Sequence, residues 1–139
     1  MIELIDVNYR IDEYAILTEI NLKIPTGECV LLAGESGSGK TTLTQLINGL
    51  IPHFYSCGQL DGGVCIQGVP VAETRMYKLA EKIGNVFQNP KSQFFYTDSS
   101  AEIAFGLENR GVPPEKIRQR IVTTANDLEI ENLLGRNIF

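Results

Sequence analysis

Alternating apolar and polar residues predict two strands at the start of the chain. Ile2 and Leu4 alternate with polar neighbours in a pattern that runs to Tyr9, as in a strand with one buried face. Residues 16–24 form a second stretch of this kind, and the turn sequence Pro-Thr-Gly-Glu follows it at residues 25–28. Two strands in quick succession predict a small antiparallel sheet.

The next segments predict an α/β unit. Residues 29–33 are a continuous apolar run, typical of a strand that is buried on both faces. Apolar residues then recur at helical spacing over residues 43–50, where Gly49 can end the helix. We expect a loop over residues 51–58, a turn at Asp61–Gly63, a short helix at residues 75–80 and another buried strand over residues 83–87.

The last third of the chain predicts helices. Ser99 or Ser100 can cap a helix that ends at Gly111. Prolines at 113 and 114 open the next helix, because proline suits the first helical turn.

Composition limits the classes of function. The 139 residues suffice for one domain, and 43% hydrophobic with 21% charged residues indicate a soluble protein. A net charge of −5 argues against a nucleic-acid surface, which needs clustered Lys and Arg. Cys29, Cys57 and Cys65 lack metal-site spacing and are expected to be reduced thiols. No apolar run is long enough to cross a bilayer, so we expect no direct membrane insertion.

The strongest motif fits the phosphate-loop pattern G-x-x-x-x-G-K-[ST], between the apolar run and the helix that follows it. Its glycines let backbone N–H groups turn inward around phosphate oxygens, and Lys40 supplies a positive charge for the β- and γ-phosphates. Thr41 offers a hydroxyl to Mg²⁺. The predicted nucleotide-binding residues of the loop are Gly34, Glu35, Ser36, Gly37, Ser38, Gly39, Lys40, Thr41 and Thr42.

Further stretches add a family resemblance: residues 48–53 (Asn-Gly-Leu-Ile-Pro-His), residues 86–95 with the Gln-Asn-Pro sequence, and residues 104–109 (Ala-Phe-Gly-Leu-Glu-Asn). With the phosphate loop, they make the sequence resemble the ATP-binding subunits of ABC transporters, most closely those of energy-coupling-factor importers. The implied fold is an α/β phosphate-loop NTPase of the ABC type, with an amino-terminal antiparallel subsheet and the start of a helical subdomain.

The resemblance also implies roles for single residues. Tyr9 would stack on adenine, with Tyr14 as a rival for that role. Gln88 would reach toward Mg²⁺ and the attacking water, which makes it a metal ligand with Thr41 and a catalytic residue with Lys40. Residues 89–97 would face the transmembrane subunit, where three consecutive aromatic residues, 94–96, suit either docking or ordinary core packing.

Other parts of the family pattern are not found. There is no Leu-Ser-Gly-Gly signature, no apolar strand that ends in Asp-Glu and no switch histidine. We therefore expect residues 1–139 to be the amino-terminal portion of such a domain, divided into a phosphate-loop core at 1–88 and the start of the helical subdomain at 89–139. Alone, it should bind ATP with hydrolysis near background. The phosphate-loop strand should lie bare, which favours instability, self-association or rearranged helices.

The expected function is an ATP-driven motor subunit for import of a vitamin or metal ion, at the cytoplasmic face of the membrane. Its partners would be a second ATP-binding subunit, identical or different, and a transmembrane coupling subunit. Two alternatives stay open: a self-contained phosphate-loop kinase or small NTPase, and a non-catalytic nucleotide-binding fragment. A GTPase is disfavoured because no Asn-Lys-x-Asp sequence is present.

Overall fold

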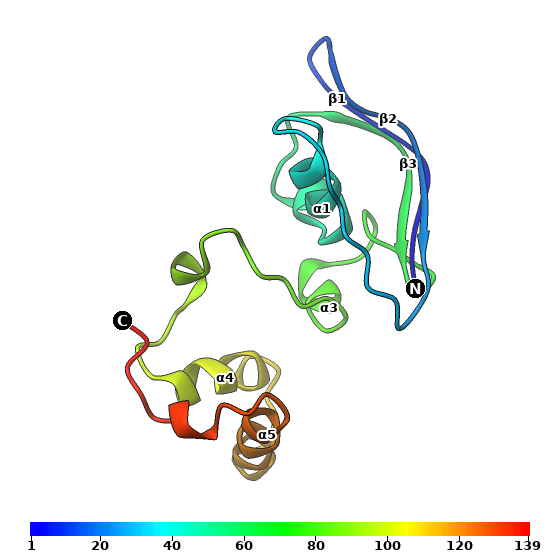
Figure 1. The fold of residues 1–139 in the computed structure, drawn as a ribbon. Helices are drawn as coiled ribbons and strands as arrows, with labels where there is room; N and C mark the ends of the chain where they lie inside the picture. Colours follow the sequence, from blue (N-terminus) through cyan, green and yellow to red (C-terminus); the bar gives the residue numbers. More distant parts are fainter. The chain divides into compact units, whose positions relative to one another are not determined.

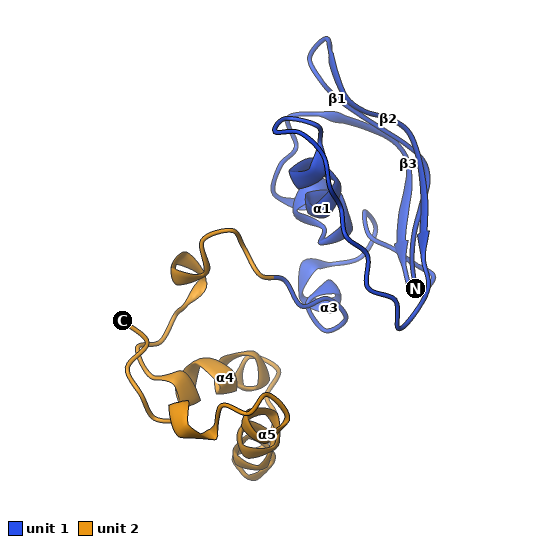
Figure 2. Ribbon diagram, viewed as in Figure 1, with its two compact units in different colours: residues 1–85 blue, residues 86–139 orange.

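The computed structural model describes residues 1–139 and divides them into two compact units (Figure 2). The first unit is Met1–Asn85 and the second is Val86–Phe139. The division therefore falls before the Gln-Asn-Pro sequence, whereas the sequence analysis placed it directly after Gln88.

A four-stranded antiparallel sheet forms the framework of the first unit (Figure 1). Its strands are β1 (Ile2–Ile11), β2 (Tyr14–Ile24), β3 (Gln59–Ile66) and β4 (Val69–Pro70), in the spatial order β2-β1-β3-β4. Both neighbours of β1 run antiparallel to it. The predicted amino-terminal antiparallel sheet is confirmed.

A β-bulge in β1 decides which side chains face the core. Asp6 has a left-handed backbone with φ 48°, and the pairing register with β2 shifts between Leu4 and Val7. The extra residue resets the alternation, so that Leu4, Val7 and Tyr9 are all buried. The carboxylate of Asp6 accepts a hydrogen bond from the amide of Asn21 at 2.8 Å, which ties the bulge to β2.

The predicted turn at Asp61–Gly63 is wrong, because these residues lie within β3. The β1 bulge explains why glycine occurs there. Gly62 has φ 84°, and a Cβ atom at this position would lie 2.4 Å from the carbonyl oxygen of Asp6. Glycine in this strand therefore permits a close approach of two backbones rather than a change of direction.

Three short helices complete the first unit: α1 (Lys40–Ile47), α2 (Leu50–His53) and α3 (Met76–Leu79). The helix α1 contacts β2 and β3. The buried core residues come from the sheet, the helices and the segment between β4 and α3; they are Leu4, Val7, Tyr9, Leu17, Leu43, Leu46, Ile51, Val64, Ile66, Val71 and Leu79.

The loop expected over residues 51–58 begins within α2, whose Ile51 has a non-helical backbone with φ −102° and ψ 126°. The Asn48 side chain accepts a hydrogen bond from the Leu50 N–H at 3.1 Å. Gly49 has φ 82°, and a Cβ atom there would lie 2.7 Å from Cδ1 of Leu79. His53 Nε2 lies 3.0 Å from the carbonyl oxygen of Val71. Residues 48–53, which belong to the family pattern, therefore connect α1 to α3 and to the segment at Val71.

The two predicted buried strands at residues 29–33 and 83–87 are not formed. Both segments lie outside the sheet, and Leu31 is 89% exposed. An extended apolar segment becomes a buried strand only where neighbours pair with its backbone and cover its faces. The four strands of the sheet pair with one another instead, and the apolar residues Val30, Leu31 and Leu32 before the phosphate loop are exposed. The instability or self-association expected of a bare phosphate-loop strand stays a prediction.

The second unit contains η1 (Pro90–Gln93), α4 (Ser99–Glu108), α5 (Pro114–Asp127) and η2 (Glu131–Leu133). The helix α4 is capped by Asp98, whose carboxylate accepts the Ala101 N–H at 3.0 Å, so the predicted caps Ser99 and Ser100 are wrong. The predicted helix that the prolines at 113 and 114 open is confirmed as α5. No helix in either unit is both long and apolar enough to span a membrane.

Ser99 and Ser100 instead hold the end of the chain against the start of α4. The Ser99 hydroxyl donates to the carbonyl oxygen of Leu133 at 2.6 Å and accepts the Arg136 N–H at 3.2 Å. The Ser100 hydroxyl accepts the Gly135 N–H at 2.9 Å.

Candidate functional site

The phosphate loop lies between the exposed apolar segment at residues 29–33 and α1. Gly37 and Gly39 adopt left-handed backbones, with φ 83° and 86°. At Gly39 a Cβ atom would lie 2.8 Å from Cδ2 of Leu17 and 3.1 Å from the carbonyl oxygen of Ile16. The loop therefore rests directly on β2, and glycine is required at this contact. The sequence analysis missed this role of Ile16 and Leu17, because their apolar character predicts burial but not the partner.

Lys40 folds back into the loop that precedes it. Its Nζ donates hydrogen bonds to the carbonyl oxygens of Gly34 at 2.8 Å and Glu35 at 2.5 Å, and it lies 3.3 Å from the Ser38 hydroxyl. The ammonium group is therefore held at the mouth of the loop by neutral acceptors. A phosphate oxygen carries a full negative charge and can replace these carbonyl oxygens as the partner of Lys40.

The start of α1 faces the same loop. Its cap is Gly39, which contributes no side-chain hydrogen bond, and its first turn contains no acidic residue. The first N–H groups of a helix have no acceptor inside the helix and carry a partial positive charge. With Lys40 and the hydroxyls of Ser38, Thr41 and Thr42, they make a donor set that fits a polyphosphate, and the Thr41 hydroxyl also fits a Mg²⁺ ion.

The two tyrosines considered for adenine stacking differ in exposure. The Tyr9 side chain is 2% exposed in the core, and a Cβ atom at Gly58 would lie 2.4 Å from its ring. Neither face of this ring is open, so the expected stacking on adenine does not fit this structure. Tyr14 is 77% exposed at the start of β2, on the strand whose Ile16 and Leu17 contact Gly39.

Gln88 belongs to the second unit and is exposed. The chain next to it is ordered by Gln93, whose side-chain oxygen accepts the Phe87 N–H at 3.2 Å. The hydroxyl of Ser92 donates to the carbonyl oxygen of Asn89 at 2.8 Å and closes the turn at η1. Gln88 therefore follows a segment whose backbone is held by side chains further along the same unit.

Three exposed aromatic residues follow this turn. Phe95 is 75% exposed and stacks on Phe105 of α4, with ring centroids 4.6 Å apart. Tyr96 meets Phe105 edge-on at 5.8 Å, and Phe94 meets Phe139 edge-on at 6.3 Å. The sequence allowed either docking or core packing for residues 94–96. Their exposure shows that they form a surface of the second unit.

Glu102 contributes to this surface and was missed by the sequence analysis. Its carboxylate accepts the N–H groups of Phe95 at 3.0 Å and Tyr96 at 2.8 Å. The sequence signal was its place in the first turn of a helix, which predicts only a favourable interaction with the helix dipole. Contact with the backbone before the helix depends on how the chain enters α4.

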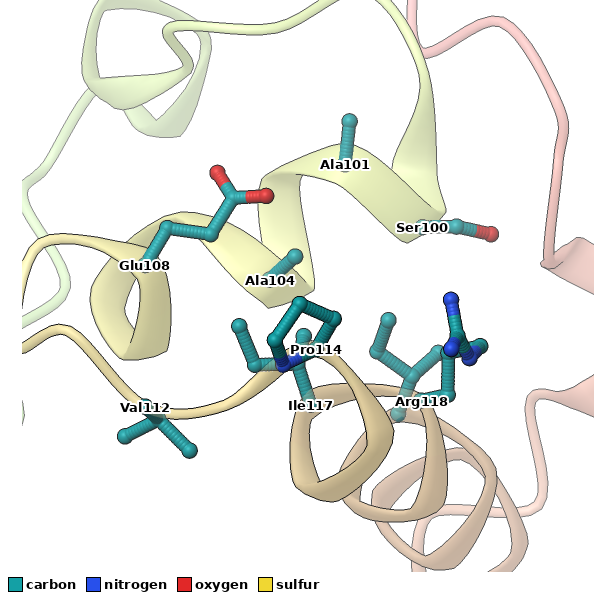
Figure 3. A pocket seen from close by; sticks show the side chains of 9 residues that line it. Ser100, Ala101, Ala104, Glu108, Val112, Pro114, Ile117 and Arg118 are labelled. Carbon is teal, nitrogen blue, oxygen red and sulfur yellow. The ribbon is translucent and has the colours of Figure 1, made fainter.

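A pocket of about 460 Å³ lies between α4 and α5 (Figure 3). Ala104 and Ile117 contribute apolar walls, while Glu108 and Arg118 lie at its rim. It contains no residue of the phosphate loop, and its lining is mainly apolar.

A phosphate loop at the start of a helix, beside an antiparallel subsheet, defines a phosphate-loop nucleotide-binding protein. Residues 17–138 match the family model described as ABC transporter, so the chain belongs to the ABC transporter ATP-binding family. This is a family of ATP-hydrolysing enzymes, and the predicted α/β fold of the ABC ATPase type is confirmed.

Relatives and a solved structure support this result. A Treponema denticola protein, named as an ABC transporter ATP-binding protein, is 54% identical over 123 residues, which are 88% of this chain and 25% of the relative. A Methanosarcina mazei protein named in the same way is 40% identical over 137 residues, 99% of this chain and 23% of the relative. The chain thus spans about a quarter of the length of these relatives.

The structural neighbour is the ATP-binding cassette MJ0796, solved as a dimer in a post-hydrolysis state with ADP and Pi. Its TM-score is 0.72 at 24% identity, and the match covers 99% of this chain and 62% of the neighbour. This likeness shows the fold.

Proposed function

We propose that this chain binds ATP with Mg²⁺ at the phosphate loop and forms part of an ATP-driven transport motor. The observation that carries the proposal is the placement of the Lys40 ammonium at the start of α1, where it is held only by neutral acceptors of its own loop. Lys40 exchanges the carbonyl oxygens of Gly34 and Glu35 for oxygens of the β- and γ-phosphates. The N–H groups of the first turn of α1 bind the same phosphates.

Mg²⁺ supplies charge neutralisation between the phosphates when it is bound. The residues proposed to hold it are Thr41, through its hydroxyl, and Gln88, through its amide oxygen. Gln88 also orients the attacking water, because a neutral amide can hold a water molecule without taking its proton. The contacts of the loop come from backbone groups, Lys40 and hydroxyls, which bind and position phosphate. We therefore infer that these 139 residues alone bind ATP with hydrolysis near background.

The adenine-stacking role is proposed for Tyr14. Its ring is exposed, whereas Tyr9 is enclosed by the core. Tyr14 lies two residues before Ile16, whose carbonyl oxygen approaches Gly39, so a strand rise of about 3.4 Å per residue keeps it within reach of a nucleotide on the loop. An aromatic ring also offers a large contact area at low entropic cost.

The wider assembly is also a proposal. The family and the exposed aromatic residues 94–96 support a transmembrane coupling subunit as one partner. The dimeric neighbour supports a second ATP-binding subunit as the other. We propose a peripheral place at the cytoplasmic face of the membrane and import of a vitamin or metal ion, as in energy-coupling-factor transporters, whose pattern residues 86–95 and 104–109 resemble.

The test is a titration of the purified chain with labelled ATP and Mg²⁺, beside a Lys40→Ala variant, with phosphate release recorded in the same samples. Saturable binding that the variant loses, without release above background, supports the proposal. Robust turnover by the chain alone would favour a self-contained NTPase. Transfer of phosphate to a small acceptor would favour a kinase.

A further inference from the structure

We propose that Leu17 is a positioning residue for the phosphate loop: its side chain on β2 supports Gly39 and so holds the first turn of α1 toward the phosphates. The inference rests on the proposed binding of ATP at this loop and adds a residue outside the loop on which that binding depends. The phosphate-loop pattern covers residues 34–41 only and gives Leu17 no part.

Gly39 lies directly against β2. A Cβ atom on Gly39 would lie 2.8 Å from Cδ2 and 3.8 Å from Cγ of Leu17, and 3.1 Å from the carbonyl oxygen of Ile16. The nearest atoms outside its own stretch of chain therefore all belong to β2. Leu17 is itself 7% exposed and belongs to the core. The start of α1 is thus supported from the core through one side chain.

This support matters because the cap residue has no side chain of its own to fix it. Gly39 has φ 86° and contributes no side-chain hydrogen bond to the helix start. Its carbonyl oxygen accepts the Leu43 N–H at 2.9 Å, which is the first hydrogen bond of α1. Glycine also has more backbone freedom than other residues. Without the contact to Leu17, Gly39 and the first turn after it could take several directions.

The direction of the helix start decides how well the loop binds phosphate. Lys40 follows Gly39 directly, and its Nζ returns to the carbonyl oxygens of Gly34 and Glu35. The N–H groups of the first turn point along the helix axis, so they bind a phosphate only where the axis points at it. A loop that already has its binding geometry loses less conformational entropy on binding. Shortening Leu17 removes no group that contacts the nucleotide, yet affinity should fall because the loop must then be ordered first.

A purely structural role of Leu17 as a core residue is the alternative, and Leu4 separates the two roles. Leu4 is 2% exposed in the same core, on the neighbouring strand β1. It pairs with Leu22, which lies five residues after Leu17 on β2, about 17 Å away in a regular strand. The same substitution at Leu4 therefore weakens the same core at a distance from Gly39.

The experiment uses the full chain with Leu17→Ala and the milder Leu17→Val, each beside the same substitution at Leu4. Leu17→Met nearly keeps the side-chain volume and should restore the contact. Calorimetry with inorganic tripolyphosphate and Mg²⁺ measures phosphate binding without the nucleoside, at a temperature where circular dichroism shows the variants folded. Lys40→Ala is included to test the phosphate site itself.

Amide hydrogen exchange is the second readout. It compares the Leu43 N–H, which binds the carbonyl oxygen of Gly39, with the Asn48 N–H, which binds that of Thr44 at the other end of α1. A loosened helix start should raise exchange at Leu43 and leave exchange at Asn48 near wild type.

Leu17→Ala should weaken tripolyphosphate binding about tenfold, the equivalent of about 1.4 kcal/mol. Leu17→Val should give a smaller loss, and Leu17→Met should bind nearly as wild type does. The variants at Leu4 should also keep wild-type affinity while they stay folded. Wild-type affinity in both Leu17→Ala and Leu17→Val, an equal loss in the Leu4 variants, or an equal rise of exchange at both ends of α1 would overturn the role of Leu17.

Failure of the phosphate site would look different. If wild type bound no tripolyphosphate, or if Lys40→Ala bound it as tightly as wild type, the proposed nucleotide site would be wrong and the role of Leu17 would be overturned with it. If Lys40→Ala lost binding while the Leu17 variants kept it, Leu17 alone would be excluded.

Discussion

At the scale of single residues, Tyr9 and Gly58 depend on each other. The Tyr9 ring occupies the space that a side chain at residue 58 would need, because a Cβ atom there would lie 2.4 Å from the ring. We expect Gly58→Ala to lower the free energy of unfolding by about 1–3 kcal/mol, because a packed ring must shift. Gly63→Ala is the matched control, since a Cβ there meets nothing within 4 Å. Urea unfolding measures both, and equal stability of the two variants would contradict the packing.

The same tyrosine predicts a dependence on pH. Burial raises the pKa of Tyr9 above its ordinary value of 10.0, and the neighbouring Cys57 adds to the shift. The native state therefore holds this proton more tightly than the unfolded state does. The stabilisation is fully present below pH 10 and is lost as the pH rises above it. In urea unfolding between pH 9 and about 11, wild type should lose more stability than Tyr9→Phe; parallel losses would refute this.

Nucleotide binding gives a second test of the two tyrosines. We expect Tyr14→Ala to weaken ATP binding about tenfold, the effect of losing about 1.4 kcal/mol of stacking. Tyr9→Phe keeps the buried ring and should leave ATP affinity unchanged. Titration with labelled ATP distinguishes them. A loss of affinity in Tyr9→Phe with none in Tyr14→Ala would return the stacking role to Tyr9.

At the scale of elements, the start of α4 does two things: Asp98 caps the helix, and Ser99 binds the segment at Leu133–Arg136. Asp98→Ala should destabilise the helix by about 1 kcal/mol, because the Ala101 N–H loses its acceptor. Ser99→Ala should instead release the segment at Leu133–Arg136 and leave the helix intact, because its hydroxyl contacts only that segment. Amide hydrogen exchange should rise along the first turn of α4 in the first variant, and at Arg136 in the second. If exchange rose at both places in both variants, the helix cap and the contacts of Ser99 would form one cooperative unit.

The strands show what the sequence could predict and what it could not. β1 and β2 were predictable, because each pairs with its neighbour in sequence through a short hairpin. The location of β3 was missed, since Gly62 signals a turn unless the opposing bulge at Asp6 is known. The segments at 29–33 and 83–87 have the composition of buried strands, yet burial depends on neighbours that composition does not reveal. Long-range pairing, rather than local preference, decided these cases.

In the candidate site, too, local features could be predicted from the sequence and long-range contacts could not. The phosphate loop could be recognised from sequence because the left-handed glycines and the Lys40 contacts lie within one short segment, while the nucleotide roles of its residues stay predictions. The poor fit of Tyr9 to adenine stacking could not be predicted, because it depends on packing against Gly58, which is far away in sequence. The support given by Glu102 was also hidden, since it depends on the direction from which the chain enters α4.

At the scale of the whole molecule, we expect the exposed apolar segment at residues 29–33 to determine whether the chain self-associates. Its Leu31 is nearly fully exposed, and exposed apolar segments with free backbone groups promote association. We expect the chain to self-associate at concentrations where Leu31→Lys stays monomeric, as measured by sedimentation velocity. Leu128→Lys is the control, because Leu128 is exposed after α5. Equal association of both variants and wild type would exclude this segment as the cause.

The contacts of Lys40 have a practical consequence for handling the protein. A cation that is held only by neutral oxygens of its own loop, beside the free amides of a helix start, will accept any abundant tetrahedral oxyanion. Phosphate and sulfate in a purification buffer would therefore act as competitors of the nucleotide and would raise the melting temperature of the sample by themselves. Affinities measured in such buffers would understate the true strength of binding, so a buffer without oxyanions is the proper reference state.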